Sequence, residues 1–109
     1  MGRGQGATSS GTVSYSLSLR PRALAEIAAA RENYALVGHG TTFLAELEAM
    51  IEAIQAMPLR FPIIYGKVHR ALLRRYPFAV FFRVRPATSH IVVLAVLPQR
   101  GDPAKWPRR

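Results

Sequence analysis

The sequence predicts a two-layer α+β fold in which a helix hairpin packs on one face of a mostly antiparallel sheet. Three observations lead to this prediction. A short alternating segment comes first, two helical patterns joined by a tight break follow, and three strand patterns fill the second half. The expected order is β-α-α-β-β-β. The length of 109 residues suits one domain. We expect it at 13–109, behind a flexible Gly- and Ser-rich tail at 1–12.

The first strand is expected in the segment VSYSLSLR, at 13–20. Its apolar residues alternate with serines, which is typical of a half-buried strand. The apolar positions should therefore face the helices. The serines, Ser14, Ser16 and Ser18, are expected on the opposite face of the sheet.

The first helix is expected to begin at Pro21, because proline is well tolerated in the first helical turn, where its missing N–H costs nothing. Gly38 can end the helix in a left-handed turn. The residues that recur at helical spacing, and should form the buried side, are Leu24, Ile27, Ala28, Arg31 and Tyr34.

The second helix is expected after a short His-Gly break, with Thr41 or Thr42 as its N-cap and Pro58 as its stop. Because the connection is so short, the two helices should form an antiparallel hairpin. The predicted buried stripe is Phe43, Leu47, Met50, Ile54 and Met57, widened by Leu44 and Ile51. The residues expected on the solvated face include Glu46, Glu48 and Glu52.

The second half contains three strand patterns. A Pro-punctuated connection at 58–67 leads to a short strand at 68–75, and a second strand follows at 78–85. A turn at 86–89 joins it to a strand at 90–97, which is apolar on both faces and should be central. In the middle strand Phe78, Val80, Phe82 and Val84 should share one face, and Ala79, Phe81, Arg83 and Arg85 the other.

Charge is distributed unevenly along the chain. The net charge is +9, and eleven of the fifteen Lys and Arg residues follow Glu52, together with one acidic residue, Asp102. This asymmetry predicts that the second half meets a polyanionic or acidic partner, such as nucleic acid, the ribosome, an acidic protein or anionic lipid. A solubilising excess of Arg in a chain rich in Arg and Ala is the alternative explanation.

Composition also disfavours several classes of protein. The chain has no Cys, which excludes disulfides and thiol chemistry. The N-terminal residues lack the apolar core of a secretory signal, and the longest apolar run, Ile91 to Pro98, is far shorter than the ~20 residues that span a bilayer. His39 and His90 share no ligand spacing, so no metal is expected. We expect a cytoplasmic protein without a cofactor.

An ordered set of motifs in the second half resembles a known family. The set is Pro58; Arg70 with Leu72 to Arg75; Tyr76-Pro77-Phe78; Phe81 to Val84; Ile91 to Val96; Arg100 with Pro103; and Trp106. In this order, behind a β-α-α segment, the motifs resemble the RelE/ParE toxins of bacterial type II toxin–antitoxin modules, over roughly Val13 to Arg108. The resemblance implies a RelE/ParE-like fold. One departure is Pro98, where many relatives have a His.

The resemblance implies two possible mechanisms. RelE-type members cut messenger RNA in the ribosome with a set of cationic residues and a Tyr. The cationic positions would fall here on Arg70, Leu72, Ala79 and Arg100, and the region of the Tyr holds Lys105-Trp106 instead. Two of these positions are apolar, whereas cleavage through a 2′-hydroxyl needs a proton acceptor, a donor and charge stabilisation together. ParE-type members bind DNA gyrase and need no catalytic set. The chain looks more like the ParE type, and we do not expect an enzyme.

The function expected from the resemblance is that of a growth-inhibiting, plasmid-stabilising type of toxin that binds DNA gyrase and is neutralised by a cognate antitoxin. A ribosome-dependent mRNA endonuclease, with Arg70, Arg75 and Arg100 as its best catalytic candidates, is one alternative. A decayed toxin or basic nucleic-acid-binding module is another. The residues expected to contact target or antitoxin are Arg70, Arg74, Arg75, Arg83, Arg85, Arg100, Lys105 and Trp106.

The arginines of this set are expected on one exposed rim beside an edge strand, where they could hold phosphates or acidic side chains or simply protect the edge. His69 next to them is expected to be exposed, with a role as an acid–base group as the alternative. Phe81 should pack under the C-terminal tail with Trp106, and stacking on a base is its alternative role.

Overall fold

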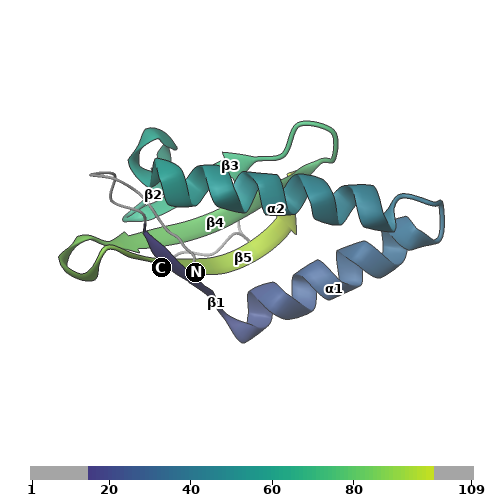
Figure 1. Cartoon of the computed structure of the whole chain (residues 1–109), viewed down its shortest axis with the longest axis horizontal. Helices are drawn as coiled ribbons and strands as arrows, with labels where there is room; N and C mark the ends of the chain where they lie inside the picture. Colours follow the sequence, from purple (N-terminus) through teal and green to yellow (C-terminus); the bar gives the residue numbers. More distant parts are fainter. Residues whose placement is uncertain (1–14, 100–109) are drawn as a thin grey trace, which may run out of the picture.

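The computed structural model describes residues 15–99 and shows two helices and a five-stranded sheet (Figure 1). The strands are β1 (Ser16–Leu19), β2 (Ile63–Tyr65), β3 (Val68–Leu72), β4 (Phe78–Arg85) and β5 (His90–Pro98). The helices are α1 (Pro21–Ala35) and α2 (Gly40–Ala56), and the 3₁₀ turns are η1 (Pro58–Arg60) and η2 (Pro86–Thr88). The predicted order is confirmed with one addition, β2. The expected tail at 1–12 lies outside the described residues.

The sheet has the strand order β1-β5-β4-β3-β2. Strand β1 pairs with β5 in parallel, and the other three pairings are antiparallel. The predicted α+β fold with a mostly antiparallel sheet is therefore confirmed, and so is the central position of β5. The expectation that the strand carrying Arg70 forms an edge is wrong. The short strand β2 pairs with β3 and forms the edge of the sheet instead. A tight turn joins the two strands at Gly66, whose φ of 54° suits a residue without a Cβ.

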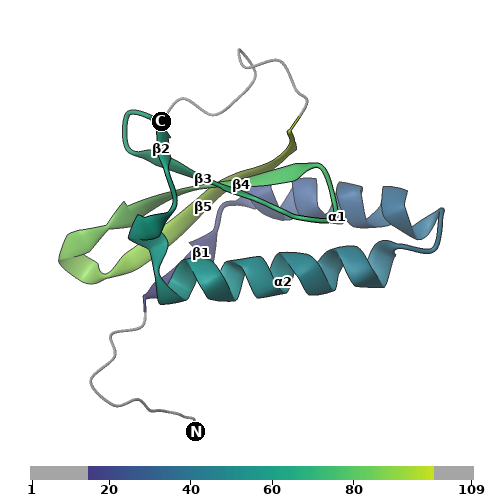
Figure 2. The ribbon, with the colours of Figure 1, turned by 90° about the horizontal axis from the view of Figure 1, so that it is seen from above.

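The helices form the predicted hairpin, converging at the turn that joins them (Figures 1 and 2). Gly38 has a φ of 81°, which confirms the left-handed end of α1. The expected cap by a threonine is wrong, because α2 begins at Gly40 with His39 in the N-cap position. A Cβ on Gly40 would lie 3.1 Å from Cβ of Ala35 and 3.3 Å from the carbonyl oxygen of Arg31. The hairpin therefore depends on a close approach at this glycine.

The buried side of α1 differs from the predicted one. Ala23 and Ala30 are its buried residues, and the half-buried Ile27 and Tyr34 pack beside them. Leu24 is 54% exposed, and the predicted positions 28 and 31 also face solvent. Small alanine side chains let the helix lie close to its neighbours. The packing therefore selects the alanine side of the helix rather than the side with the larger leucine.

Helix α2 buries most of its predicted stripe. Phe43, Leu47 and Ile54 are buried, with Met50 and the two predicted flanking residues packed against them. Met57 is the exception at 56% exposed, because α2 ends one residue earlier and Pro58 opens η1. The predicted stop at this proline is confirmed.

The two faces of the sheet carry separate apolar clusters. Val80 and Phe82 of β4 join the core beneath the helices, whereas Phe81 lies in a second buried cluster. This confirms the predicted alternation. In β5 the alternation is interrupted, because the pairing jumps from Val93 to Ala95 between successive residues of β4. This β-bulge shifts the alternation by one residue, so that Val93 and Val96 both reach the core beneath the helices while Ala95 joins the second cluster.

Candidate binding groove

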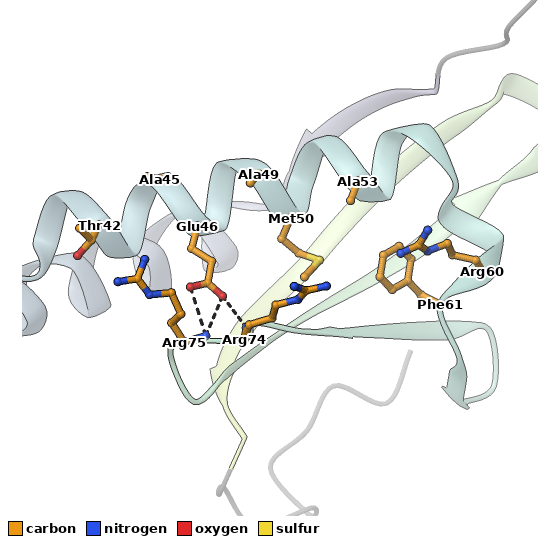
Figure 3. A pocket seen from close by; sticks show the side chains of 10 residues that line it. All are labelled: Thr42, Ala45, Glu46, Ala49, Met50, Ala53, Arg60, Phe61, Arg74 and Arg75. Atoms are coloured by element: carbon orange, nitrogen blue, oxygen red, sulfur yellow. Dashed lines mark hydrogen bonds between the residues drawn. The ribbon is translucent and has the colours of Figure 1, made fainter.

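A groove runs along the outer side of α2 (Figure 3). Its volume is about 560 Å³. Short side chains line the groove at every fourth residue of the helix, at Ala45, Ala49 and Ala53. Because these side chains are short, they leave open space along this side of α2. Met50 and Phe61 add larger apolar surface. The groove therefore has the length and apolar lining that suit a chain segment lying along α2.

Three arginines line the groove, which is otherwise mostly apolar. Arg60 comes from η1, and Arg74 and Arg75 come from the loop between β3 and β4. All three are exposed. The groove therefore combines apolar lining with cationic groups that a partner's carboxylates or phosphates could reach.

Glu46 of α2 fixes the loop that carries two of these arginines (Figure 3). Its Oε2 accepts hydrogen bonds from the backbone N–H groups of Arg74 and Arg75, the latter at 3.0 Å. Because the carboxylate bonds to the backbone, both guanidinium groups are left available. The expectation that Glu46 merely faces solvent is therefore wrong.

Tyr76 holds the same loop from the buried side. The residue is only 7% exposed, and its ring lies edge-on to Tyr34 and Phe43. Its hydroxyl is 2.6 Å from Oγ1 of Thr42, which in turn donates to the carbonyl of His39. The same contact affects Tyr34, whose pKa is raised mainly by its own burial and secondarily by the Tyr76 hydroxyl. The loop is thus held on both sides, which pre-organises the arginines at the groove.

The predicted contact residues do not form one rim. Arg74 and Arg75 precede β4, whereas Arg83 and Arg85 are at its far end (Figure 1). Arg70 lies on β3 and is half-buried. The remaining three predicted positions, Arg100, Lys105 and Trp106, are outside the described residues, as is the expected packing of the tail on Phe81. The structure therefore separates the predicted set into groups that one small partner surface cannot cover together.

His69 is buried rather than exposed. Its side chain is 5% accessible, its ring stacks on Phe82 at 5.0 Å between centroids, and Nδ1 is 2.8 Å from the carbonyl oxygen of Phe61. The predicted exposure is therefore wrong. A packed imidazole bonded to the backbone has a structural role here, because it ties β3 to the segment that closes the end of the groove.

The described region contains no group of three metal-ligating side chains. Neither α1 nor α2 has the length and apolarity needed to cross a membrane.

Similarity to proteins of known structure was found at the level of the fold. A chain of the chromosomal ParDE toxin–antitoxin system of P. aeruginosa superposes with a TM-score of 0.65 at 21% identity, over 77% of this chain and 95% of that chain. The isolated E. coli RelE toxin gives a TM-score of 0.60 at 16% identity, over 83% and 89%. A chain of the intact E. coli RelBE complex gives 0.60 at 17% identity, over 77% and 95%.

The chain has the fold of these toxin–antitoxin structures. The RelE/ParE-like architecture implied by the sequence resemblance is therefore confirmed. No protein-family model and no curated protein sequence matches the chain.

Proposed function

We propose that the chain is the toxin of a type II toxin–antitoxin module, acting in the cytoplasm on DNA gyrase by binding rather than by cleavage. The fold shared with the ParDE and RelE structures supports the toxin assignment. The single observation that favours binding is the pairing of Leu72 with Ala79 on adjacent strands. The sequence resemblance assigns nuclease cations to these two positions. In this chain both side chains are apolar, so neither position supplies the charge that cleavage needs.

The proposed antitoxin contact is the groove along α2. A segment with acidic and small apolar residues could lie over the alanines while its carboxylates meet Arg74 and Arg75. Exposed charge pairs contribute only about 0.2–1 kcal/mol each, so the arginines should act mainly on the association rate. The five acidic residues of the described region lie on the helices, and the one in the groove, Glu46, already bonds to the loop backbone.

Brief induction of the chain in a bacterial host tests the toxin assignment. Growth should stop, and co-expression of the protein encoded beside it should restore growth. Primer-extension mapping on the same cells separates the mechanisms. Intact transcripts with a DNA-damage response support gyrase binding, and new cuts within codons support the endonuclease. Unimpaired growth with high soluble yield, together with salt-sensitive binding to any nucleic acid, would support the decayed toxin or basic module instead.

Charge reversal tests the groove as the antitoxin's landing site. Arg74→Glu with Arg75→Glu should slow antitoxin capture at low ionic strength, and the difference should fade as salt is added. The matched control is Arg83→Glu with Arg85→Glu, which changes the net charge equally at the far end of β4. Equal slowing in both double variants would show that only net charge matters and would remove the groove from the proposal.

A further inference from the structure

A second polar cluster lies at the end of the sheet remote from Arg74 and Arg75. In the strand register, Ser16 of β1 pairs with His90 of β5, and His90 pairs with Arg85 of β4. Side chains of directly paired residues project from the same face of a sheet. These three residues therefore form a row across three strands, on the face away from the helices.

A parallel row lies two residues further along the strands. Val92 of β5 pairs with Ser18 on one side and with Arg83 on the other. Arg20 follows Ser18 by two residues, and both of these side chains line a hollow of about 320 Å³ to which Arg85 also contributes. Each row thus contributes residues to a concave surface that carries hydroxyl and guanidinium groups.

His90 is held between the two serines. Its Nδ1 is 2.6 Å from Oγ of Ser16, and its Nε2 is 2.9 Å from Oγ of Ser18. Where Nε2 donates to Ser18, the hydroxyl proton of that serine is available to the oxygens of a ligand. The Ser16 hydroxyl has an acceptor of its own in the carbonyl oxygen of Ser89, at 3.5 Å, so Ser16 serves to hold the ring.

The surroundings of this cluster favour an anion. All five acidic residues that the structure describes lie on α1 or α2, and none of them lines the hollow. The described strands carry no Asp or Glu. Arg20 and Arg85 therefore line the hollow with no carboxylate beside them, and an anion with several acceptor oxygens would satisfy them.

We propose that Ser18, Arg20 and Arg85 form a binding site for a phosphate group, with Ser16 and His90 as the residues that position Ser18. Phosphate oxygens accept hydrogen bonds from guanidinium and hydroxyl donors at once, and arginine is well suited to their geometry. The phosphate can be the terminal group of a nucleotide or part of a polynucleotide backbone. The site does not depend on the toxin assignment, because it rests on residues outside the groove along α2.

Nuclear magnetic resonance of the full chain, at constant ionic strength, tests the site. Inorganic phosphate, adenosine 5′-monophosphate and a single-stranded RNA oligonucleotide are added separately. Saturable shifts of the Ser18 amide and the His90 ring are expected with at least one of them. A stronger response to the monophosphate indicates a terminal phosphate, and a stronger, salt-dependent response to the oligonucleotide indicates a backbone phosphate. No saturable shift with any of the three overturns the proposal.

Single substitutions identify the groups that bind. Arg85→Gln and Ser18→Ala should each weaken the binding, the arginine variant by about tenfold, because it removes charge-assisted hydrogen bonds. Lys67→Gln removes the same charge from an exposed position that lines neither the hollow nor the groove, and it should leave the affinity unchanged. Resonances of the helices report whether each variant stays folded. If Arg85→Gln and Lys67→Gln bind equally, the phosphate is attracted by overall charge and the site is refuted.

Discussion

Replacing Glu46 by alanine should release the loop that positions Arg74 and Arg75. The carboxylate accepts hydrogen bonds from both backbone N–H groups, and bonds to a charged group contribute about 1.5–3 kcal/mol in protected sites. Because Glu46 is partly exposed, we take a combined loss of about 2 kcal/mol in the free energy of unfolding. For a domain of this size the melting temperature should fall by about 10 °C.

Urea denaturation, monitored by far-ultraviolet circular dichroism, measures this loss of stability. Glu48→Ala is the matched control, since Glu48 is exposed on the same helix and a surface change of this kind should stay within about 0.5 kcal/mol. Glu46→Gln keeps an acceptor without the charge and should lie between the two. Equal stability of the Glu46→Ala and Glu48→Ala variants would refute the anchoring of the loop by this carboxylate.

Three further substitutions test contacts that hold the helices and β3 in place. Gly40→Val should lower the free energy of unfolding by about 1–3 kcal/mol, because the two helices approach closely at this residue. An unchanged melting temperature would show that the helices can move apart without cost. His69→Ala should cost about 2 kcal/mol through its bond to Phe61 and its stacked ring, and an unchanged urea midpoint would contradict this. The raised pKa of Tyr34 means that the folded state holds this proton longer than the unfolded state, so stability should fall as pH rises through about 10. Tyr34→Phe should flatten that alkaline decline in urea titrations at several pH values, and a decline as steep as that of the unchanged chain would contradict this.

Local patterns in the sequence predicted the elements whose surroundings are simple. The alternation of β4, the apolar character of β5 and the stops at Gly38 and Pro58 depend on neighbours along the chain, and all are confirmed. Strand β2 could not be predicted in this way. It has three residues after a proline, and only its pairing with β3 makes it a strand.

The candidate site depended on contacts between residues distant in sequence. Glu46 and Arg75 are 29 positions apart, and nothing in either local pattern indicates that the carboxylate binds the loop backbone. His69 was predicted to be exposed because it stands among arginines, whereas its neighbours in space are Phe61 and Phe82. The arginines could be recognised as a group from charge alone. Their separation to opposite ends of β4 follows from the bounds of that strand, whereas the position of Arg85 beside His90 required the strand register.

A DNA gyrase supercoiling assay with the purified chain tests the central proposal most directly. Relaxed plasmid, gyrase and ATP are incubated with increasing amounts of the chain, with and without the antitoxin, and a parallel reaction contains translating ribosomes and messenger RNA. A toxin that acts by binding gyrase should block supercoiling or trap cleaved plasmid, should be reversed by the antitoxin, and should leave the messenger intact. Undisturbed supercoiling with codon-specific cleavage of the messenger would contradict the account.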